Sequence, residues 1–77
     1  MAKKIYVGNL PGTATQIEVQ KLFATYGKVV SVKIEGGGRM AIAYVEMVDD
    51  AQASTAIRGL DNAKMGTNIL NVNEARP

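Results

Sequence analysis

Cysteine, histidine and tryptophan are absent from this chain of 77 residues, and its aromatic residues are three tyrosines and one phenylalanine. Without cysteine there is no disulfide, no thiolate nucleophile and no cysteine-based metal site. Without histidine the chain lacks the commonest general base and the commonest metal ligand. No nucleophile and base stand at a spacing typical of an active site, so we expect no enzymatic activity, no metal and no cofactor. Small secreted proteins usually carry disulfides, so we expect a cytoplasmic location, with nucleus and plastid as alternatives.

Long hydrophobic runs and a strong charge of one sign are also absent. The longest apolar run is too short for a membrane-spanning helix, and the N-terminal residues lack the apolar core of a signal peptide, so we expect no membrane association. The net charge of +2 permits nucleic-acid binding without requiring it. The length predicts a single domain over residues 1–77.

Residue spacing predicts four strands and two helices. Strands are expected over 3–9, 28–34, 40–47 and 69–74, where apolar and polar residues alternate. The first helix should begin at the capping box Thr15-Gln16-Ile17-Glu18, and the second should span 50–59 with Asp49 as its N-cap. The run Gly36-Gly37-Gly38 predicts a hairpin between the second and third strands.

The alternation also predicts which strand residues face the core. The expected inward-facing set is Ile5, Val7, Val30, Val32, Ile34, Ala41, Ala43, Val45, Met47, Leu70 and Val72. Tyr6 and Tyr44 fall on the opposite face, so two aromatic rings lie outside the predicted core. One interpretation is that these rings bind a ligand. The other is that they only pack against each other across neighbouring strands.

The order strand, helix, strand, strand, helix, strand predicts the ferredoxin-like βαββαβ fold of the α+β class. Both helices have one apolar face, so they should pack on the same side of a four-stranded antiparallel sheet. The other side should stay open to solvent or to a partner. The residues expected on this open face are Lys4, Tyr6, Gly8, Ser31, Lys33, Glu35, Met40, Ile42, Tyr44, Glu46, Asn71 and Asn73.

Two of the predicted strands resemble the motifs of the RNA recognition motif family. The segment Ile5-Tyr6-Val7-Gly8-Asn9-Leu10 matches the family's first-strand hexapeptide at every position, and residues 40–47 align with its third-strand octapeptide. The resemblance covers nearly the whole chain and is closest to the small single-domain RNA-binding proteins of bacteria and plastids. It implies the ferredoxin-like fold and non-catalytic binding of single-stranded RNA on the open face.

The resemblance also implies roles for individual residues. Tyr6 and Tyr44 stand at two of the three positions at which the family stacks bases, and Ile42 stands at the third. Met40 replaces the usual lysine or arginine that contacts phosphate, with Arg39 beside it. Each stacked base contributes roughly 1–3 kcal/mol, so we expect weak affinity. The expected RNA-binding residues are Tyr6, Tyr44, Ile42, Met40, Arg39, Lys4, Lys33, Asn71, Asn73 and Arg76.

The expected partner is single-stranded RNA, with single-stranded DNA as an alternative ligand. A second hypothesis comes from the apolar side chains on the same face. Met40, Ile42 and Tyr44 would form an exposed apolar surface that could contact another protein or a second copy of the chain.

Overall fold

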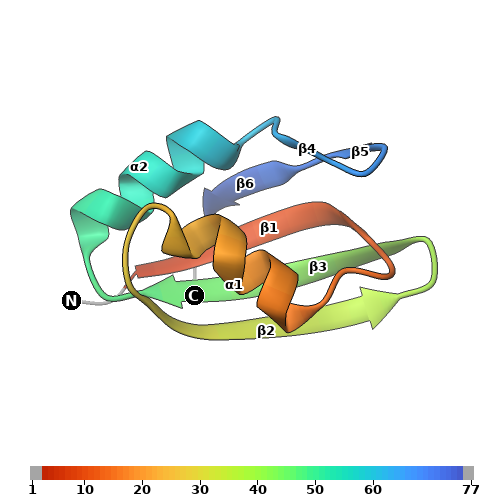
Figure 1. Ribbon diagram of the computed structural model, residues 1–77, viewed down its shortest axis with the longest axis horizontal. Helices are drawn as coiled ribbons and strands as arrows, with labels where there is room; N and C mark the ends of the chain where they lie inside the picture. Colours follow the sequence, from red (N-terminus) through yellow and green to blue (C-terminus); the bar gives the residue numbers. More distant parts are fainter. Residues whose placement is uncertain (1–2, 76–77) are drawn as a thin grey trace.

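The computed structural model describes residues 3–75, which form two helices, a four-stranded antiparallel sheet and a small hairpin (Figure 1). In chain order the elements are β1 (Lys3–Pro11), α1 (Gln16–Ala24), β2 (Val29–Gly37), β3 (Met40–Met47), α2 (Asp50–Leu60), β4 (Lys64–Met65), β5 (Asn68–Ile69) and β6 (Asn71–Glu74). The strands of the sheet lie in the order β2-β3-β1-β6, and β4 pairs only with β5. The predicted ferredoxin-like arrangement is confirmed.

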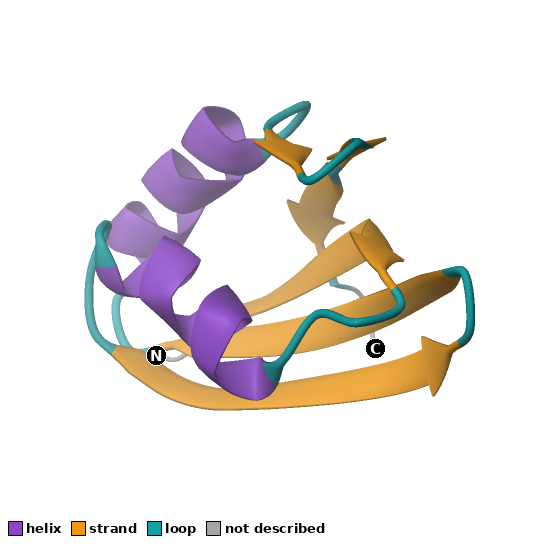
Figure 2. Ribbon diagram, turned by 45° about the vertical axis from the view of Figure 1, so that its right-hand side comes forward, coloured by secondary structure: helices purple, strands orange, loops and turns teal. Residues whose placement is uncertain are grey.

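Both helices cover the same face of the sheet, and no element of residues 3–75 covers the opposite face (Figure 2). The helices bury Val19 and Phe23 from α1, and Ala53, Ala56 and Leu60 from α2. The small alanines let the backbone of α2 approach the sheet closely. The strands contribute to the same core the buried side chains Ile5, Val7, Leu10, Ala41, Ala43, Val45, Met47, Leu70 and Val72. Neither described helix is long or apolar enough to cross a membrane.

The predicted N-termini of both helices are confirmed by their hydrogen bonds. The Thr15 hydroxyl accepts from the backbone N–H of Glu18 at 3.2 Å, and the Glu18 carboxylate accepts from the backbone N–H of Thr15 at 2.9 Å. The Asp49 carboxylate accepts from the backbone N–H of Gln52 at 2.8 Å. Such contacts satisfy N–H groups that the helix itself cannot pair, and each cap stabilises its helix by about 1 kcal/mol.

The prediction that Val30 faces the core is wrong, and the neighbouring Val29 takes that place. Val30 is 52% exposed, whereas Val29 packs against the core. The reason is a bulge: Val29 lies opposite Met47 and Ser31 lies opposite Glu46, so Val30 is an extra residue in the ladder. After the bulge the alternation resumes, and Val32 and Ile34 pack on the helix side as predicted.

A second bulge interrupts β1, which runs on to Pro11 rather than ending at residue 9. The pairing with β3 shifts between Val7 and Leu10, and Asn9 adopts a left-handed conformation with φ of 64°. Asn9 also holds the β4–β5 hairpin. Its side-chain amide donates to the backbone carbonyl of Ile69 at 2.8 Å. Its backbone carbonyl accepts from the side-chain amide of Asn68 at 3.2 Å. This hairpin is absent from the sequence-based prediction.

The predicted glycine-rich hairpin joins β2 to β3 through a two-residue turn. Gly37 pairs with Met40, which leaves Gly38 and Arg39 as the turn residues. Gly38 has φ of 70°, a conformation that is costly for residues with a side chain and is typical of the first central position of a type II′ turn. The turn also contacts the loop after β1, because a Cβ placed on Gly12 would overlap the carbonyl of Gly38.

Candidate nucleic-acid interface

The centre of the open face is a row of four side chains, one from each strand of the sheet. Tyr6 of β1 lies opposite Tyr44 of β3 on one side and Asn73 of β6 on the other. Tyr44 in turn lies opposite Lys33 of β2. The row therefore reads Lys33, Tyr44, Tyr6, Asn73. It combines two rings with a cation and an amide, the groups that contact bases and phosphates in single-stranded nucleic acids.

The two tyrosine rings contact each other and remain partly exposed. Their centroids are 5.9 Å apart and their planes are tilted by 59°. Tyr6 also covers Gly8, since a Cβ on Gly8 would come within 2.7 Å of the Tyr6 hydroxyl oxygen. Gly8 is buried for this reason, although it lies on the open face. The two tyrosines thus pack against each other across neighbouring strands, as the second interpretation expected. This packing leaves both rings partly exposed.

The other predicted site residues surround this row. Ile42 lies opposite Glu35, and Asn71 lies opposite Gly8. Met40 begins β3 beside the hairpin turn and is 58% exposed, and Arg39 in the turn is exposed. Lys4 lies opposite Glu46 at the other end of the face. Arg76 falls outside the described residues.

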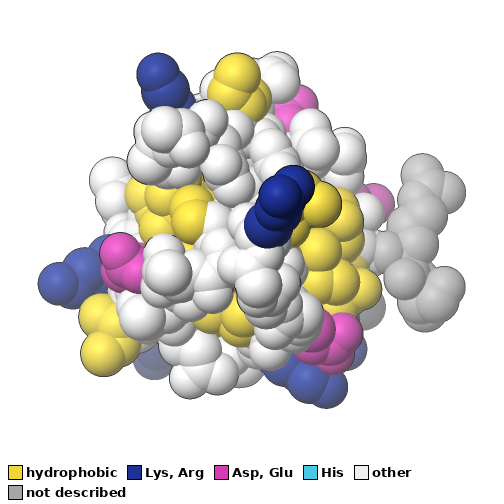
Figure 3. Space-filling view, turned by 90° about the vertical axis from the view of Figure 1, so that its right-hand side faces the viewer, with side chains coloured by type: hydrophobic (Ala, Val, Ile, Leu, Met, Phe, Trp, Pro, Cys, Tyr) yellow, Lys and Arg dark blue, Asp and Glu magenta, His cyan; other side chains and the backbone are white. Residues whose placement is uncertain are grey.

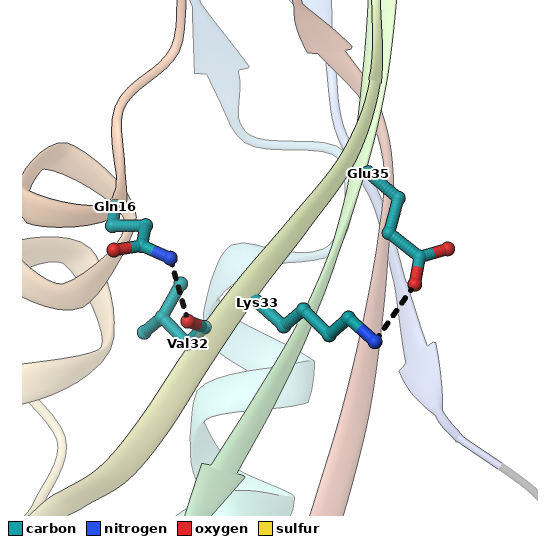
Figure 4. A network of polar contacts seen from close by, with 4 residues as sticks. All are labelled: Gln16, Val32, Lys33 and Glu35. Atoms are coloured by element: carbon teal, nitrogen blue, oxygen red, sulfur yellow. Dashed lines mark hydrogen bonds and ion pairs between the residues drawn. The ribbon is translucent and has the colours of Figure 1, made fainter.

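Charges of both signs lie on this face. The Lys33 ammonium is 3.3 Å from the Glu35 carboxylate, and the side chain of Lys33 is largely exposed while that of Glu35 is about half exposed. Figure 4 shows this pair projecting from one side of β2, while Gln16 of α1 approaches the strand from the other side and donates to the Val32 carbonyl at 3.2 Å. An exposed ion pair contributes about 1 kcal/mol or less, so Lys33 can exchange Glu35 for a phosphate at little cost.

An open depression of about 440 Å³ extends the site toward the hairpin turn. Its lining consists of Tyr6, Asn9, Glu35, Gly36, Met40, Ala41 and Ile42. Figure 3 views the molecule from this end and shows several hydrophobic patches, with one basic side chain near the middle of the view and the other charged groups toward the margins. Sequence reasoning did not include Glu35 or Asn9 among the site residues. Strand alternation places Glu35 on the correct face, but only the bulge at Asn9 turns that residue toward the depression.

Asn71 and Asn73 are exposed, and within residues 3–75 their side chains make no hydrogen bond to the protein. Their amide groups are therefore free to donate to, and accept from, a ligand. Among these described residues, no three acidic side chains come together in a way that could hold a metal ion. The chemistry available on the open face is stacking, hydrogen bonding and ion pairing.

A comparison with protein families settles the classification. The sequence pattern of the RNA recognition motif matches residues 5–71, which is most of the chain. The chain belongs to the RNA recognition motif family. The motif's first and third strands are β1 and β3, the two strands that carry Tyr6 and Tyr44.

Individual RNA recognition motif proteins are similar to the chain over nearly its full length. RbpF of Nostoc sp. is named as an RNA-binding protein. It is 43% identical to this chain over 77 residues, which cover 95% of this chain and 73% of RbpF. A chloroplastic 31 kDa ribonucleoprotein of Nicotiana sylvestris is 34% identical over 94% of this chain, which spans 24% of that protein. The crystal structure of RNA-binding protein PG1 is 33% identical, with a TM-score of 0.86 over 97% of this chain and 98% of PG1. The expected likeness to small bacterial and plastid proteins is confirmed.

Proposed function

We propose that this protein binds single-stranded RNA non-catalytically on the open face of its sheet, with bases stacked on Tyr6 and Tyr44. The observation that carries the proposal is the central row, in which the two partly exposed rings lie between Lys33 and Asn73. Membership of the family and the RNA binding ascribed to RbpF support it. The rings would hold bases, Lys33 would contact a phosphate, and Asn73 would hydrogen-bond a base edge.

We expect the affinity to be weak for two reasons. Ile42 stands at the third stacking position and has no ring, so one contribution of roughly 1–3 kcal/mol is missing. The lysines of the face, Lys4 and Lys33, each lie near a glutamate, which reduces the attraction for phosphates. Few phosphate contacts also predict a shallow dependence of the affinity on salt concentration.

The experiment is a fluorescence anisotropy titration of labelled single-stranded RNA with the wild type, Tyr44→Phe and Tyr44→Leu. Phenylalanine keeps the ring, and leucine keeps apolar bulk without a ring. We expect Tyr44→Phe to bind like the wild type and Tyr44→Leu to bind about fivefold or more weakly. Equal affinity of all three proteins would contradict stacking on Tyr44. Single-stranded DNA of the same sequence, titrated in parallel, tests the alternative ligand.

The exposure of Met40 favours a second candidate function, contact with another protein or a second copy of the chain. Met40 is 58% exposed beside the partly buried Ile42 and Tyr44, so the end of the face near the hairpin is apolar. Sedimentation equilibrium of the wild type and Met40→Lys tests self-association. A dimer that is lost in the variant would support it, and a wild type that stays monomeric at high concentration would argue against it.

A further inference from the structure

The depression beside Tyr6 has the size and the lining of a binding site for one nucleobase. It is an open hollow with a volume of about 440 Å³, within the range of roughly 300–1,000 Å³ that is usual for small-ligand sites. Tyr6, Met40, Ala41 and Ile42 make most of its lining apolar. Tyr6 belongs both to this lining and to the central row, so the nucleotide in the depression would be next to the one stacked on the tyrosines.

The polar side chains of the depression offer acceptors. The Asn9 amide nitrogen already donates to the Ile69 carbonyl at 2.8 Å, so this donor is occupied. Glu35 uses one carboxylate oxygen for Lys33, and within the described residues its other oxygen has no hydrogen-bond partner. A carboxylate has about four lone-pair sites, so Glu35 keeps most of its accepting capacity. Its side chain is 46% exposed and can be reached by a ligand.

Among the four RNA bases, only guanine presents two adjacent donors on its pairing edge, N1–H and the N2 amino group. Adenine and cytosine each present one amino group beside an acceptor nitrogen, and uracil presents one N–H between two carbonyl oxygens. A carboxylate that faces any of these three bases would meet at least one acceptor, which repels it. Against guanine, both oxygens can accept, in a charge-assisted bidentate pair.

We infer that Glu35 selects guanine at the nucleotide position next to the tyrosine platform. This inference rests on the proposed function and adds the base specificity of one position. Met40 and Ile42 contact the face of the guanine, and this apolar contact replaces the stacking ring that is missing at Ile42.

The test compares pentamers that differ only in their central base. Labelled UUGUU, UUIUU and UUAUU are titrated against the wild type, where I is inosine, which keeps N1–H and lacks the N2 amino group. The wild type should bind UUGUU about fivefold or more tightly than the other two. In Glu35→Gln the side-chain amide nitrogen is itself a donor and opposes one guanine donor, so the preference for guanine over inosine should fall below about twofold.

Glu46→Gln is the matched control, because it removes the same charge from the same face at a distance from the depression. Glu46→Gln should bind every pentamer somewhat more tightly, and Glu35→Gln should do so for the pentamers without guanine, since each variant loses a charge that repels phosphate. Only Glu35→Gln should lose the guanine preference. A wild type that binds the three pentamers equally, or a preference that survives in Glu35→Gln, would overturn the inference alone. Absence of binding to every pentamer, and to longer single-stranded RNA, would overturn the proposed function together with it.

Discussion

Tyr6 of β1 and Tyr44 of β3 lie directly opposite each other on the open face, with ring centroids 5.9 Å apart. A tilted aromatic pair of this kind contributes about 0.5–1.5 kcal/mol beyond the area it buries. The contact therefore restricts the rings before any ligand arrives, and less rotamer freedom is lost when a base stacks on them. The same contact explains how two tyrosines can stabilise the sheet and serve as a binding platform.

Replacement of Ile42 by phenylalanine should strengthen RNA binding. Ile42 is partly exposed on the same strand as Tyr44, two residues away on the same face. A ring there would add one stacking contribution of roughly 1–3 kcal/mol, so affinity should rise about fivefold or more. Ile42→Leu is the control, because it adds no ring and should leave the affinity within about twofold. Anisotropy titrations of both variants measure the difference, and an equal gain from leucine would show that bulk rather than stacking matters.

Gly12→Ala should destabilise the protein and displace the β2–β3 hairpin. A Cβ on Gly12 would overlap the carbonyl of Gly38, and a backbone atom cannot move aside cheaply. We expect a loss of about 1–3 kcal/mol in the free energy of unfolding, measured by urea denaturation. Gly37→Ala serves as the control, because no atom lies within 4 Å of its added Cβ. The same small effect from both substitutions would contradict the close packing of the hairpin turn against Gly12.

Asn9 should tolerate glycine better than alanine, the reverse of the usual order. Either substitution removes the side-chain hydrogen bond to the Ile69 carbonyl, which contributes about 1 kcal/mol. Alanine also has to adopt φ of 64°, at a further cost of about 1–2 kcal/mol, whereas glycine adopts it freely. Urea denaturation of the two variants checks this order. A more stable alanine variant would argue against the left-handed bulge at this position.

The pKa of Lys3 should be above its ordinary value, and the shift should depend on Glu74. The Lys3 ammonium lies 2.7 Å from the Glu74 carboxylate, and this hydrogen bond raises the pKa of Lys3 from 10.5, with a smaller attraction from Asp50. The charged form is thus favoured in the folded state, so the contribution to stability is complete below pH 10.5 and is lost as the pH rises through the folded-state pKa. NMR titration of the Lys3 side chain should show a lower pKa in Glu74→Gln than in the wild type. An unchanged pKa would contradict the pairing.

The regular parts of the fold were predictable because local signals determine them. Alternation identified β3 with its bounds, and the capping residues Thr15 and Asp49 located both helix starts. The bulges at Val30 and Asn9 were not predictable, because each depends on the register with β3, which no local pattern encodes. The two-residue strands β4 and β5 escaped prediction for a similar reason, since Asn9 holds them from a distant part of the chain.

The candidate site also has a part that was predictable from the sequence and a part that was not. Strand alternation together with the family motifs placed Tyr6, Tyr44, Lys33 and Asn73 on one face, and the pairing of the strands aligned them in one row. The depression near the hairpin was not predictable, because its shape depends on the β1 bulge and on the approach of the turn to β1. The candidate role of Glu35 in base selection depends on this depression, so strand alternation alone could not predict it.

The most direct test of the central claim is an NMR titration of isotope-labelled protein with short single-stranded RNA. We predict amide shift changes that cluster on the open face, over residues 4–8, 31–35, 40–46 and 71–75, and that are weaker at the same RNA concentration in Tyr44→Leu. The outer surfaces of α1 and α2 should not respond. No shift changes at millimolar RNA, or changes confined to the helices, would contradict RNA binding on this face.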